Sequence, residues 1–436
     1  MILASFKQNK SLGCSEGRYP VKRHLVGSAA GVALALVLTG CGKGGSSGGA
    51  DADGKTIRFV AAKYDDDTQP YWENLIKDFE AENPGYQVEL EVVDWEQIDS
   101  KVKTYTQTGQ QPDVLNYNKF SDFARDDLIH RAKDVVSPKV LDDFLPIFAD
   151  QAQYEGVQYG LPFISSARLF FYNKDIFDKA GISEPPSSWA EVEDAAEKVK
   201  KAGDIPLGLP LGAEEAQAEF SIWAMNNGGG WTDKSGQWAV DQRANVETLD
   251  FLQKLTKAGL TQPNPEATNR KDVFNQFAQG KIGMINGAVF MRKGFIDTVD
   301  KKLNYGVAPL PSKDGTTHNT LGVQDYLVAF KKDEDKNREA VNKFLDFFYQ
   351  KKNASKFLST EGFLSVTKSA GDALSADSAY YKPFVDALSG ARFAPTGNPN
   401  WATVEGAVKQ RIGTAVSSAE PEEVLSEIQK TAEKDG

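Results

Sequence analysis

Hydrophobic residues follow two alternating spacings along the chain from Lys55 onward. Runs in which every second residue is apolar predict strands, and runs with apolar residues three and four positions apart predict helices. These spacings predict strand, helix, strand, helix and strand over residues 57–60, 71–79, 88–92, 98–105 and 113–115. Strands that alternate with helices indicate a parallel sheet flanked by helices.

The same alternation begins again at Arg168 and continues towards the C-terminus. Ser188 and Glu191 form the pattern of a capping box, which opens a helix that Gly203 ends. Another helix is predicted over residues 246–255, and further strands over residues 168–172, 282–285 and 326–330. Because no second linker interrupts the alternation, we expect two α/β lobes that share the chain.

The N-terminal segment has the parts of a secretory signal peptide. A cationic trio at residues 22–24 precedes the apolar run 25–38, which is shorter than the ~20 residues that a membrane-spanning helix needs. The run ends in Leu38-Thr39-Gly40-Cys41, which resembles the lipobox of bacterial lipoproteins. That resemblance implies that residues 1–40 are removed and that acyl chains on Cys41 hold the protein on a membrane. The first twenty residues are unusually polar for such a signal, so we expect the true start near residue 21.

Composition limits the partners of the exported protein. Residues 41–54 are nearly all small or polar and predict a flexible tether. The formal net charge of −11 becomes more negative without residues 1–40, which carry five cations and one anion. So acidic a surface argues against nucleic acid or anionic lipid as the main partner. Apart from Cys41, the only cysteine is Cys14 in the predicted leader, so we expect no disulfide in the exported domain.

Seven short motifs then occur in an order that resembles a known family. From the N-terminal side they are residues 111–119, 159–163, 169–174, 188–191, 277–287, 306–311 and 362–366. In this order they resemble the extracellular sugar-binding lipoproteins of ABC importers, the group that includes maltose-binding protein. The resemblance extends from about Lys55 to the C-terminus.

The resemblance implies an α/β, periplasmic-binding-protein-like fold. In this fold two lobes with mixed sheets are joined by several hinge crossings, and the ligand binds in the cleft between them. The crossings are expected near residues 163–168, 322–326 and 366–368. Lobe one would consist of residues 55–163 and 326–367, and lobe two of residues 168–322 and 368–436.

The resemblance also implies a function. The chain is expected to be the substrate-binding protein of an ABC transporter, which captures a mono- or oligosaccharide and delivers it to permease subunits in the membrane. We expect it to be a monomer and not an enzyme, with no cofactor and no metal. It would lie on the extracytoplasmic face of the cell membrane, anchored through Cys41.

A sugar presents hydroxyl groups at its rim and apolar C–H groups on its faces, so its site needs planar polar side chains and aromatic rings. Tyr64 and Asp66 follow the first predicted strand, where α/β proteins place ligand groups, although a solvated acidic turn has the same appearance. Further polar candidates follow the third strand, lie at the expected crossings, or match the acidic stretch that contacts sugar in maltose-type proteins. They are Asn116, Asn118, Lys119, Ser165, Arg168, Glu214, Glu215, Gln324 and Asp325.

Three other segments are candidates through their aromatic rings. Asn286 and Phe290 belong to the turn in which maltose-type proteins carry a stacking tryptophan, but Val289 stands at the matching position here. Trp401 lies in a loop of Gly, Asn and Pro and is the expected second stacking ring. Trp231 follows three glycines, and packing on the surface of a lobe would explain it equally well.

A secreted glycoside hydrolase is the alternative function, because paired carboxylates and aromatic rings also build glycosidase sites. Other enzyme classes fit less well. A serine hydrolase needs a histidine base, and only His130 and His318 follow the predicted leader. A metal site would lack thiolates and closely spaced histidines. The acidic run 65–67 is too short for a calcium loop.

Overall fold

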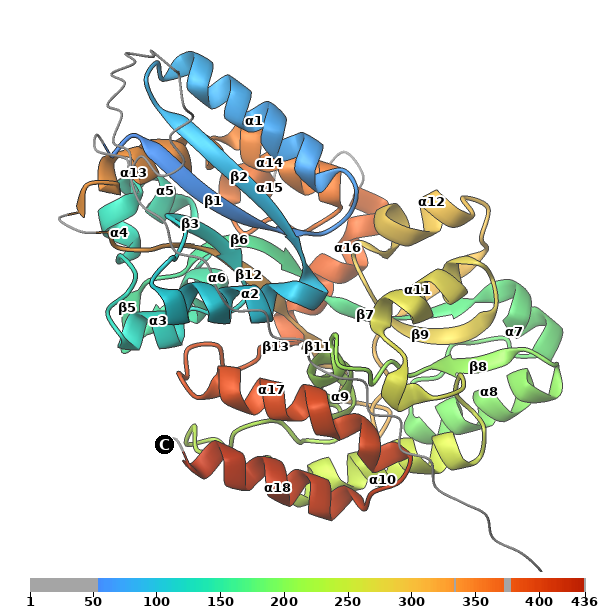
Figure 1. Cartoon of the computed structure of the whole chain (residues 1–436). Coiled ribbons are helices and arrows are strands. Elements are labelled where there is room, and N and C mark those ends of the chain that lie inside the picture. Colours follow the sequence, from blue (N-terminus) through green and yellow to red (C-terminus); the bar gives the residue numbers. More distant parts are fainter. Residues whose placement is uncertain (1–53, 333–334, 372–377, 435–436) are drawn as a thin grey trace, which may run out of the picture. The chain divides into compact units, whose positions relative to one another are not determined.

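The computed structural model describes residues 54–332, 335–371 and 378–434. Within them, two α/β regions are each built on one main sheet (Figure 1). The first region contains the sheet β2(Gln87–Asp94), β1(Thr56–Lys63), β3(Val114–Tyr117), β12(Val323–Ala329) and β6(Leu161–Ser166), in this spatial order. The second region contains the sheet β10(Tyr305–Ala308), β7(Arg168–Asn173), β9(Ile282–Ala288) and β8(Ile205–Gly208).

The sheet of the first region is mixed. β1 runs parallel to β2 and β3, as the alternation of strands and helices predicts. β12 runs antiparallel to both β3 and β6, so the sheet is mixed, as the family resemblance implied. Its direction differs because β12 does not follow a helix of this region. It enters from the second region through β11(Thr320–Leu321).

Helix α1 shows how the apolar spacing builds the core of the first region. Its apolar residues at the predicted helical spacing are all buried, and the ring of Trp72 stacks on Phe163 at a centroid distance of 5.9 Å. The helices of this region are α1(Thr68–Glu82), α2(Trp95–Thr108), α3(Ser121–Arg125), α4(Ala132–Val135), α5(Pro138–Asp143), α6(Pro146–Gln151), α13(Arg338–Phe348), α14(Lys351–Glu361) and α15(Lys368–Gly371). A short hairpin, β4(Gln153–Tyr154) and β5(Val157–Gln158), lies between α6 and β6.

The capping box predicted in the second region is confirmed. Ser188 Oγ accepts a hydrogen bond from the Glu191 amide at 3.2 Å, and the Glu191 carboxylate accepts one from the Ser188 amide at 3.1 Å. The helices of this region are α7(Lys174–Ala180), α8(Trp189–Lys201), α9(Ala216–Met225), α10(Arg243–Lys257), α11(Arg270–Ala278), α12(Asp297–Val299), α16(Ser378–Ala387), α17(Trp401–Arg411) and α18(Pro421–Lys434). Shorter elements are η1(Pro265–Ala267), η2(Arg292–Ile296), η5(Leu388–Gly390), β13(Ala391–Arg392) and η6(Ile412–Val416).

The main chain passes between the two sheets at neighbouring points. Ala167 is the single residue between β6 and β7, and Gly322 is the single residue between β11 and β12. A Cβ atom on Gly322 would lie 2.5 Å from the ring of Phe393, so any larger residue would require this ring to shift. A third segment lies beside them, because Leu364 exchanges backbone hydrogen bonds with Ser165. The boundaries of the two expected lobes stay a prediction.

The N-terminal motifs are only partly covered by the structure. Residues 49–56 match the letters of a phosphate-binding loop, G-x-x-x-x-G-K-T. Such a loop leads into a helix, whereas Lys55 and Thr56 lead into strand β1, so the local structure does not fit that motif. The predicted leader and Cys41 lie outside the described residues. Among the helices of residues 54–332, 335–371 and 378–434, none is long and apolar enough to cross a membrane.

Candidate ligand-binding site

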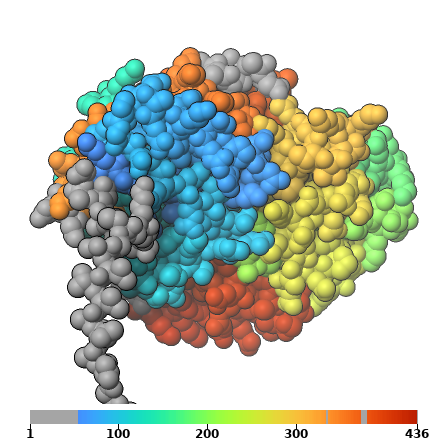
Figure 2. Space-filling model, turned by 45° about the horizontal axis from the view of Figure 1, so that its top comes forward, coloured from blue at the N-terminus to red at the C-terminus, as the bar shows by residue number. Residues whose placement is uncertain are grey.

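A cavity of about 170 Å³ lies between the two regions. In the first region its walls come from the ends of β1 and β2, the start of α2 and the segment around Phe363. In the second region they come from β7, α9, α11 and α17, and from the residues just before α9. On the face shown in Figure 2, the blue surface of the first region directly adjoins the yellow and red surfaces of the second.

Aromatic rings form one corner of this cavity. Trp95 is the first residue of α2, directly after β2, and its half-buried ring lies 5.9 Å from the ring of Tyr64. Phe363 packs edge-on against Tyr64 at 4.9 Å and against Phe290 at 5.5 Å. These rings line the cavity from both regions. The corner therefore offers apolar faces that a flat, partly apolar ligand can cover.

Asp325 is a buried carboxyl at the cavity, close to the passage at Gly322. Its Oδ2 accepts a hydrogen bond from the Tyr64 hydroxyl at 2.6 Å, and that hydroxyl also lies 3.2 Å from Asn116 Oδ1. Burial raises the pKa of Asp325 to about 7, although the bond from Tyr64 lowers it. The carboxyl is therefore partly protonated near neutral pH, when it can donate as well as accept a hydrogen bond.

A group of four charged residues, the arginine cluster, forms the second-region wall. It consists of Arg168 on β7, Glu214 and Glu215 just before α9, and Arg270 at the start of α11. Arg168 Nη2 donates to Glu215 Oε1 at 2.9 Å, and Arg270 donates to the other oxygen of Glu215. Burial alone would raise the pKa of Glu215, but the two arginines lower it. All four residues belong to the second region, so this wall is complete within one region.

Another buried carboxyl group, that of Glu219, lies behind the arginine cluster. Glu219 Oε1 accepts hydrogen bonds from Trp223 Nε1 at 2.9 Å and from Asn286 Nδ2 at 2.8 Å. Burial raises the pKa of Glu219 to about 7. Asn286 lines a small adjoining pocket together with Arg168 and Glu215 but not the main cavity. Its amide therefore positions Glu219 and supports the wall from behind.

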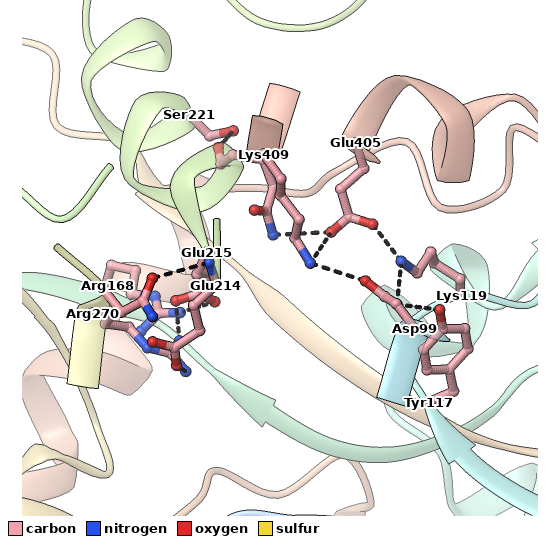
Figure 3. Close-up of polar contacts among 12 residues, drawn as sticks. Asp99, Tyr117, Lys119, Arg168, Glu214, Glu215, Ser221, Arg270, Glu405 and Lys409 are labelled. Atoms are coloured by element: carbon pink, nitrogen blue, oxygen red, sulfur yellow. Dashed lines mark hydrogen bonds and ion pairs between the residues drawn. The ribbon is translucent and has the colours of Figure 1, made fainter. Parts of the chain in front are cut away.

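A second group of four charged residues, the bridging cluster, connects the two regions (Figure 3). Asp99 in α2 and Lys119 after β3 belong to the first region, and Glu405 and Lys409 in α17 belong to the second. Lys119 Nζ lies 2.7 Å from Glu405 Oε2 and 2.9 Å from Asp99 Oδ1, and Lys409 Nζ lies 3.2 Å from Asp99 Oδ2. Gln217 Nε2 donates to Glu405 Oε1 at 2.9 Å. Asp99, Gln217 and Lys409 line the cavity.

Five buried polar atoms of cavity residues have no hydrogen-bond partner among the described residues. They are Asn118 Oδ1, Arg168 Nε, Gln217 Oε1 and both carboxyl oxygens of Glu361. A buried polar atom without a partner costs about 1–3 kcal/mol. A ligand with hydroxyl groups can satisfy atoms of each kind, because a hydroxyl both donates and accepts.

The structure brings about half of the predicted site residues together. Those that line the cavity are Tyr64, Asn118, Arg168, Glu214, Glu215, Phe290 and Asp325. Tyr64 and Asn118 follow the ends of β1 and β3, which is the reason for which they were predicted. The other five were predicted from the expected crossings or from the resemblance to maltose-type proteins. Whether each one binds ligand stays a prediction.

Other predicted residues do not line the cavity. The side chain of Asp66 is almost fully exposed and pairs with Lys63 at 2.8 Å, as expected of a solvated acidic turn. Asn116 and Ser165 are buried within the first sheet, where they hydrogen-bond to neighbouring strands or segments. Gln324 donates to the Phe148 carbonyl at 3.0 Å. Lys119 lies behind the wall as part of the bridging cluster.

The two predicted stacking tryptophans lie in the core of the second region. Trp401 is 2% exposed and Trp231 is 6% exposed, and their ring centroids are 5.4 Å apart. Phe220 packs against Trp231 at 5.4 Å. The expectation that the Trp401 ring faces the cleft is therefore wrong. As the first residue of α17, Trp401 anchors this helix by burying a large apolar ring.

Several cavity residues were not predicted. Trp95 directly follows the second strand, so the rule that placed Tyr64 after the first strand would have found it. Arg270 begins an ordinary amphipathic helix, and Gln217 lies on α9, an apolar helix whose residues are all buried. Asp99 and Lys409 meet only because segments more than 300 residues apart come together. No local signal in the sequence identifies these two.

A larger cavity of about 870 Å³ lies in the second region alone. Residues 228–230, Trp231 and Phe393 are part of its lining. Its asparagines already have partners: Asn226 Nδ2 donates to the Ile222 carbonyl, and its Oδ1 accepts from the Asn319 amide. The smaller cavity has buried polar atoms without partners and walls from both regions. It is therefore the better candidate for the ligand-binding site.

Comparisons with known proteins agree with this fold. BAB2_0491 of Brucella abortus (strain 2308), named only as a binding protein, is 31% identical over 390 residues, which cover 88% of this chain and 93% of that protein. The sn-glycerol-3-phosphate-binding periplasmic protein UgpB of Brucella melitensis biotype 1 is 30% identical over 239 residues, which cover 52% and 53% of the two chains.

The structure of maltose-bound MalE3 from T. maritima superposes with a TM-score of 0.77 at 20% identity, covering 86% of this chain and 98% of that one. This likeness confirms the predicted periplasmic-binding-protein-like fold. A family model for bacterial extracellular solute-binding proteins matches residues 65–355. The chain therefore belongs to the family of bacterial extracellular solute-binding proteins.

Proposed function

We propose that this protein binds a small neutral carbohydrate in the cavity between its two regions and presents it to an ABC permease. The observation that carries the proposal is the combination of aromatic faces with unpartnered buried polar atoms in one cavity. Trp95 and Tyr64 supply the faces, and Asn118, Arg168 and Gln217 supply the atoms. Sugar rings need both kinds of contact at once.

The charges of the cavity favour a ligand without a phosphate group. Arg168 and Arg270 are already engaged by Glu215, and Lys409 is engaged by Asp99. Further carboxylates line the cavity, namely Asp65, Asp94 and Glu96. An anionic ligand would have to compete with these carboxylates for the buried cations. The name of the partial relative UgpB makes sn-glycerol-3-phosphate the natural competitor to test.

The size of the cavity favours a short ligand. Its volume of about 170 Å³ lies below the ~300–1,000 Å³ typical of pockets for drug-sized molecules. We therefore favour a mono- or disaccharide over a long oligosaccharide. Closure of the two regions around such a ligand would rotate the backbone mainly at the passages through Ala167 and Gly322.

A role in transport would require partner subunits. Its folded residues lead from Lys55 and Thr56 into a strand, so the phosphate-binding-loop letters do not form a nucleotide site there. Movement of the solute therefore needs permease and ATPase subunits encoded elsewhere. We further propose that acylated Cys41 holds the protein on the extracytoplasmic face of the membrane and that it works as a monomer.

The test is a thermal-shift screen of the purified full chain against neutral mono- and disaccharides, with sn-glycerol-3-phosphate as the charged competitor. A ligand at 100 times its Kd adds about 2.7 kcal/mol of stability, which is a clear shift. Chromatography of the recovered sugar checks that it is unchanged. A shift with the phosphate compound alone would contradict the carbohydrate proposal, and turnover of the sugar would favour the glycoside hydrolase.

The anchor needs a separate test. Mass spectrometry of membrane-extracted protein should show an acylated Cys41 as its first residue, because the lipobox-like segment ends there. The Cys41→Ser variant should appear in the soluble fraction. Full membrane retention of this variant would contradict lipid anchoring.

A further inference from the structure

The bridging cluster forms one wall of the cavity. Among the described residues, this is the wall at which charged residues of the first region pair with charged residues of the second. Its four residues carry two positive and two negative charges, so it has no net charge. Two of them lie deep: the side chains of Lys119 and Glu405 are 11% and 2% exposed. Paired in this way, they compensate much of the cost of burying isolated charges.

This wall is two side chains thick. Asp99, Gln217 and Lys409 face the cavity, and Lys119 and Glu405 lie directly behind them. The layers are joined by Lys119 Nζ to Asp99 Oδ1 at 2.9 Å and by Gln217 Nε2 to Glu405 Oε1 at 2.9 Å. Figure 3 shows Lys409 between the arginine cluster and Glu405. A ligand cannot extend in this direction without breaking the ion pairs.

The wall also presents an acceptor to the ligand. Gln217 donates through Nε2 to Glu405, which fixes the orientation of its amide group. Its Oε1 remains buried and without a partner among the described residues. A terminal hydroxyl of a short sugar can donate to this oxygen, whereas a further sugar unit at that position would meet the wall.

We propose that the bridging cluster limits the length of the ligand, so that the site accepts a mono- or disaccharide and rejects longer chains. This inference rests on the proposed carbohydrate function. Lys409 is the residue on which it depends most directly. Its ammonium group lies 3.2 Å from Asp99 Oδ2 and 3.8 Å from Glu405 Oε1 and so connects the front of the wall with its back.

The test uses the full chain and two matched substitutions. Lys409→Ala removes the side chain from the wall, and Lys409→Met removes the charge but keeps most of the volume. Calorimetry measures binding of glucose, maltose and maltotetraose, and of laminaribiose and laminaritetraose. Lys254→Ala, which breaks an ion pair with Glu193 outside the cavity, controls for loss of a lysine.

We expect the unaltered protein to bind a mono- or disaccharide at least roughly 100-fold more tightly than the tetrasaccharide of the same series. Lys409→Ala should reduce this ratio to less than about tenfold, and Lys409→Met should change it less. The Lys254→Ala ratio should equal that of the unaltered protein. Melting curves of each variant check folding, and the milder Asp99→Asn variant replaces Lys409→Ala if that variant is unfolded.

The outcomes separate the two proposals. Equal binding of short and long sugars by the unaltered protein would overturn the length limit and leave the carbohydrate function standing. A ratio that Lys409→Ala does not change would also overturn it. Absence of binding to every sugar would contradict the carbohydrate function and, with it, this inference.

Discussion

The two charged clusters at the cavity have the same composition but a different construction. Each contains two cations and two carboxylates. The arginine cluster comes from one region, where β7, the start of α9 and the start of α11 already hold its members. The bridging cluster takes Asp99 and Lys119 from one region and Glu405 and Lys409 from the other. Only the second depends on how the regions meet.

This difference assigns the clusters different roles. A cluster within one region is preorganised, so a ligand finds it ready and pays little to order it. A cluster between regions forms its ion pairs only when those regions are close, so it contributes to the closed arrangement and not to the folding of either region. Substitutions in the arginine cluster should therefore change folding stability most, and substitutions in the bridging cluster should change binding.

The largest expected effect is that of Arg168→Met. The guanidinium group is buried and pairs with Glu215 at 2.9 Å, so its removal leaves that carboxylate short of a partner. Loss of one partner from a buried pair typically costs about 3–5 kcal/mol of unfolding free energy. Urea denaturation measures this loss. Lys254→Ala, in an exposed pair, should cost no more than about 1 kcal/mol. Equal losses would mean that the arginine cluster is not a rigid part of its region.

Trp401→Ala should cause a comparable loss for a different reason. The ring is buried against Trp231 at the start of α17, the helix that carries Glu405 and Lys409. Truncation of a buried tryptophan costs about 3–5 kcal/mol. Trp401→Phe should lose less, because it keeps a ring. Urea denaturation and calorimetry together distinguish the roles. A large loss of affinity at unchanged stability would show that Trp401 contacts the ligand and is not mainly a core residue.

Trp95→Ala should show the opposite behaviour. This ring is half-buried at the start of α2, the helix that carries Asp99, and it lines the cavity. Loss of a central stacking ring typically costs about 2–4 kcal/mol of binding free energy, or roughly one to three decades in Kd. The melting temperature without ligand should change little. Calorimetry on Trp95→Ala and Trp95→Phe measures the effect, and unchanged affinity in both variants would exclude stacking.

Trp95 and Trp401 show how far the sequence alone leads. The fold was predictable because periodicity reports burial directly: all the apolar positions expected in α1 are buried, and Ser188 and Glu191 form their capping box. Trp401 was misassigned because a ring in a polar loop looks exposed. Its burial depends on Trp231, which is distant in the sequence but adjacent in the core.

Without the family resemblance, the cavity lining was predictable only where it follows from strand ends. Tyr64 was found in this way, and Asn118 follows the third strand by the same rule. The pairing of Lys119 with Glu405 joins residues 286 positions apart, and no local pattern encodes it. Lys119 was predicted to contact the ligand because it belongs to the polar segment that follows the third strand. Its actual partners are carboxylates that only the folded chain brings near.

A moderate effect of pH is expected from Asp325, which lies between the Tyr64 corner and the arginine cluster. Burial raises its pKa from 3.8 to about 7, and the charge of Glu215 adds to this. Between these pH values the folded protein holds a proton that the unfolded chain has lost. The stability contributed by Asp325 is therefore greatest below pH 3.8 and is lost as the pH rises towards 7, by up to ~1.4 kcal/mol per unit.

Comparison with Asp325→Asn isolates this contribution, because carboxylates with lowered pKa values act in the opposite direction elsewhere in the chain. Urea denaturation of both proteins at pH 5, 6, 7 and 8 gives two curves. Their difference should change between pH 5 and 7 and level off above. Parallel curves would show that Asp325 is ionised throughout, and that the arginine cluster compensates its charge fully.

The smallest effect on folding is expected from Asp99→Asn, which tests the bridging cluster directly. The side chain of Asp99 is 45% exposed, and it holds Lys119 and Lys409 from the first-region side. Because water solvates this half-exposed carboxylate and both lysines keep Glu405 as a partner, the unfolding free energy should fall by no more than about 1 kcal/mol. Binding should suffer more, since the variant keeps each region intact but weakens the attraction between them. Calorimetry and urea denaturation on the same preparation measure both, with Lys254→Ala as the control for an exposed lysine pair. A loss of unfolding free energy as large as that of Arg168→Met would show that both clusters are parts of one rigid body. The proposed difference between a preorganised arginine cluster and a bridging cluster that forms on closure would then be wrong.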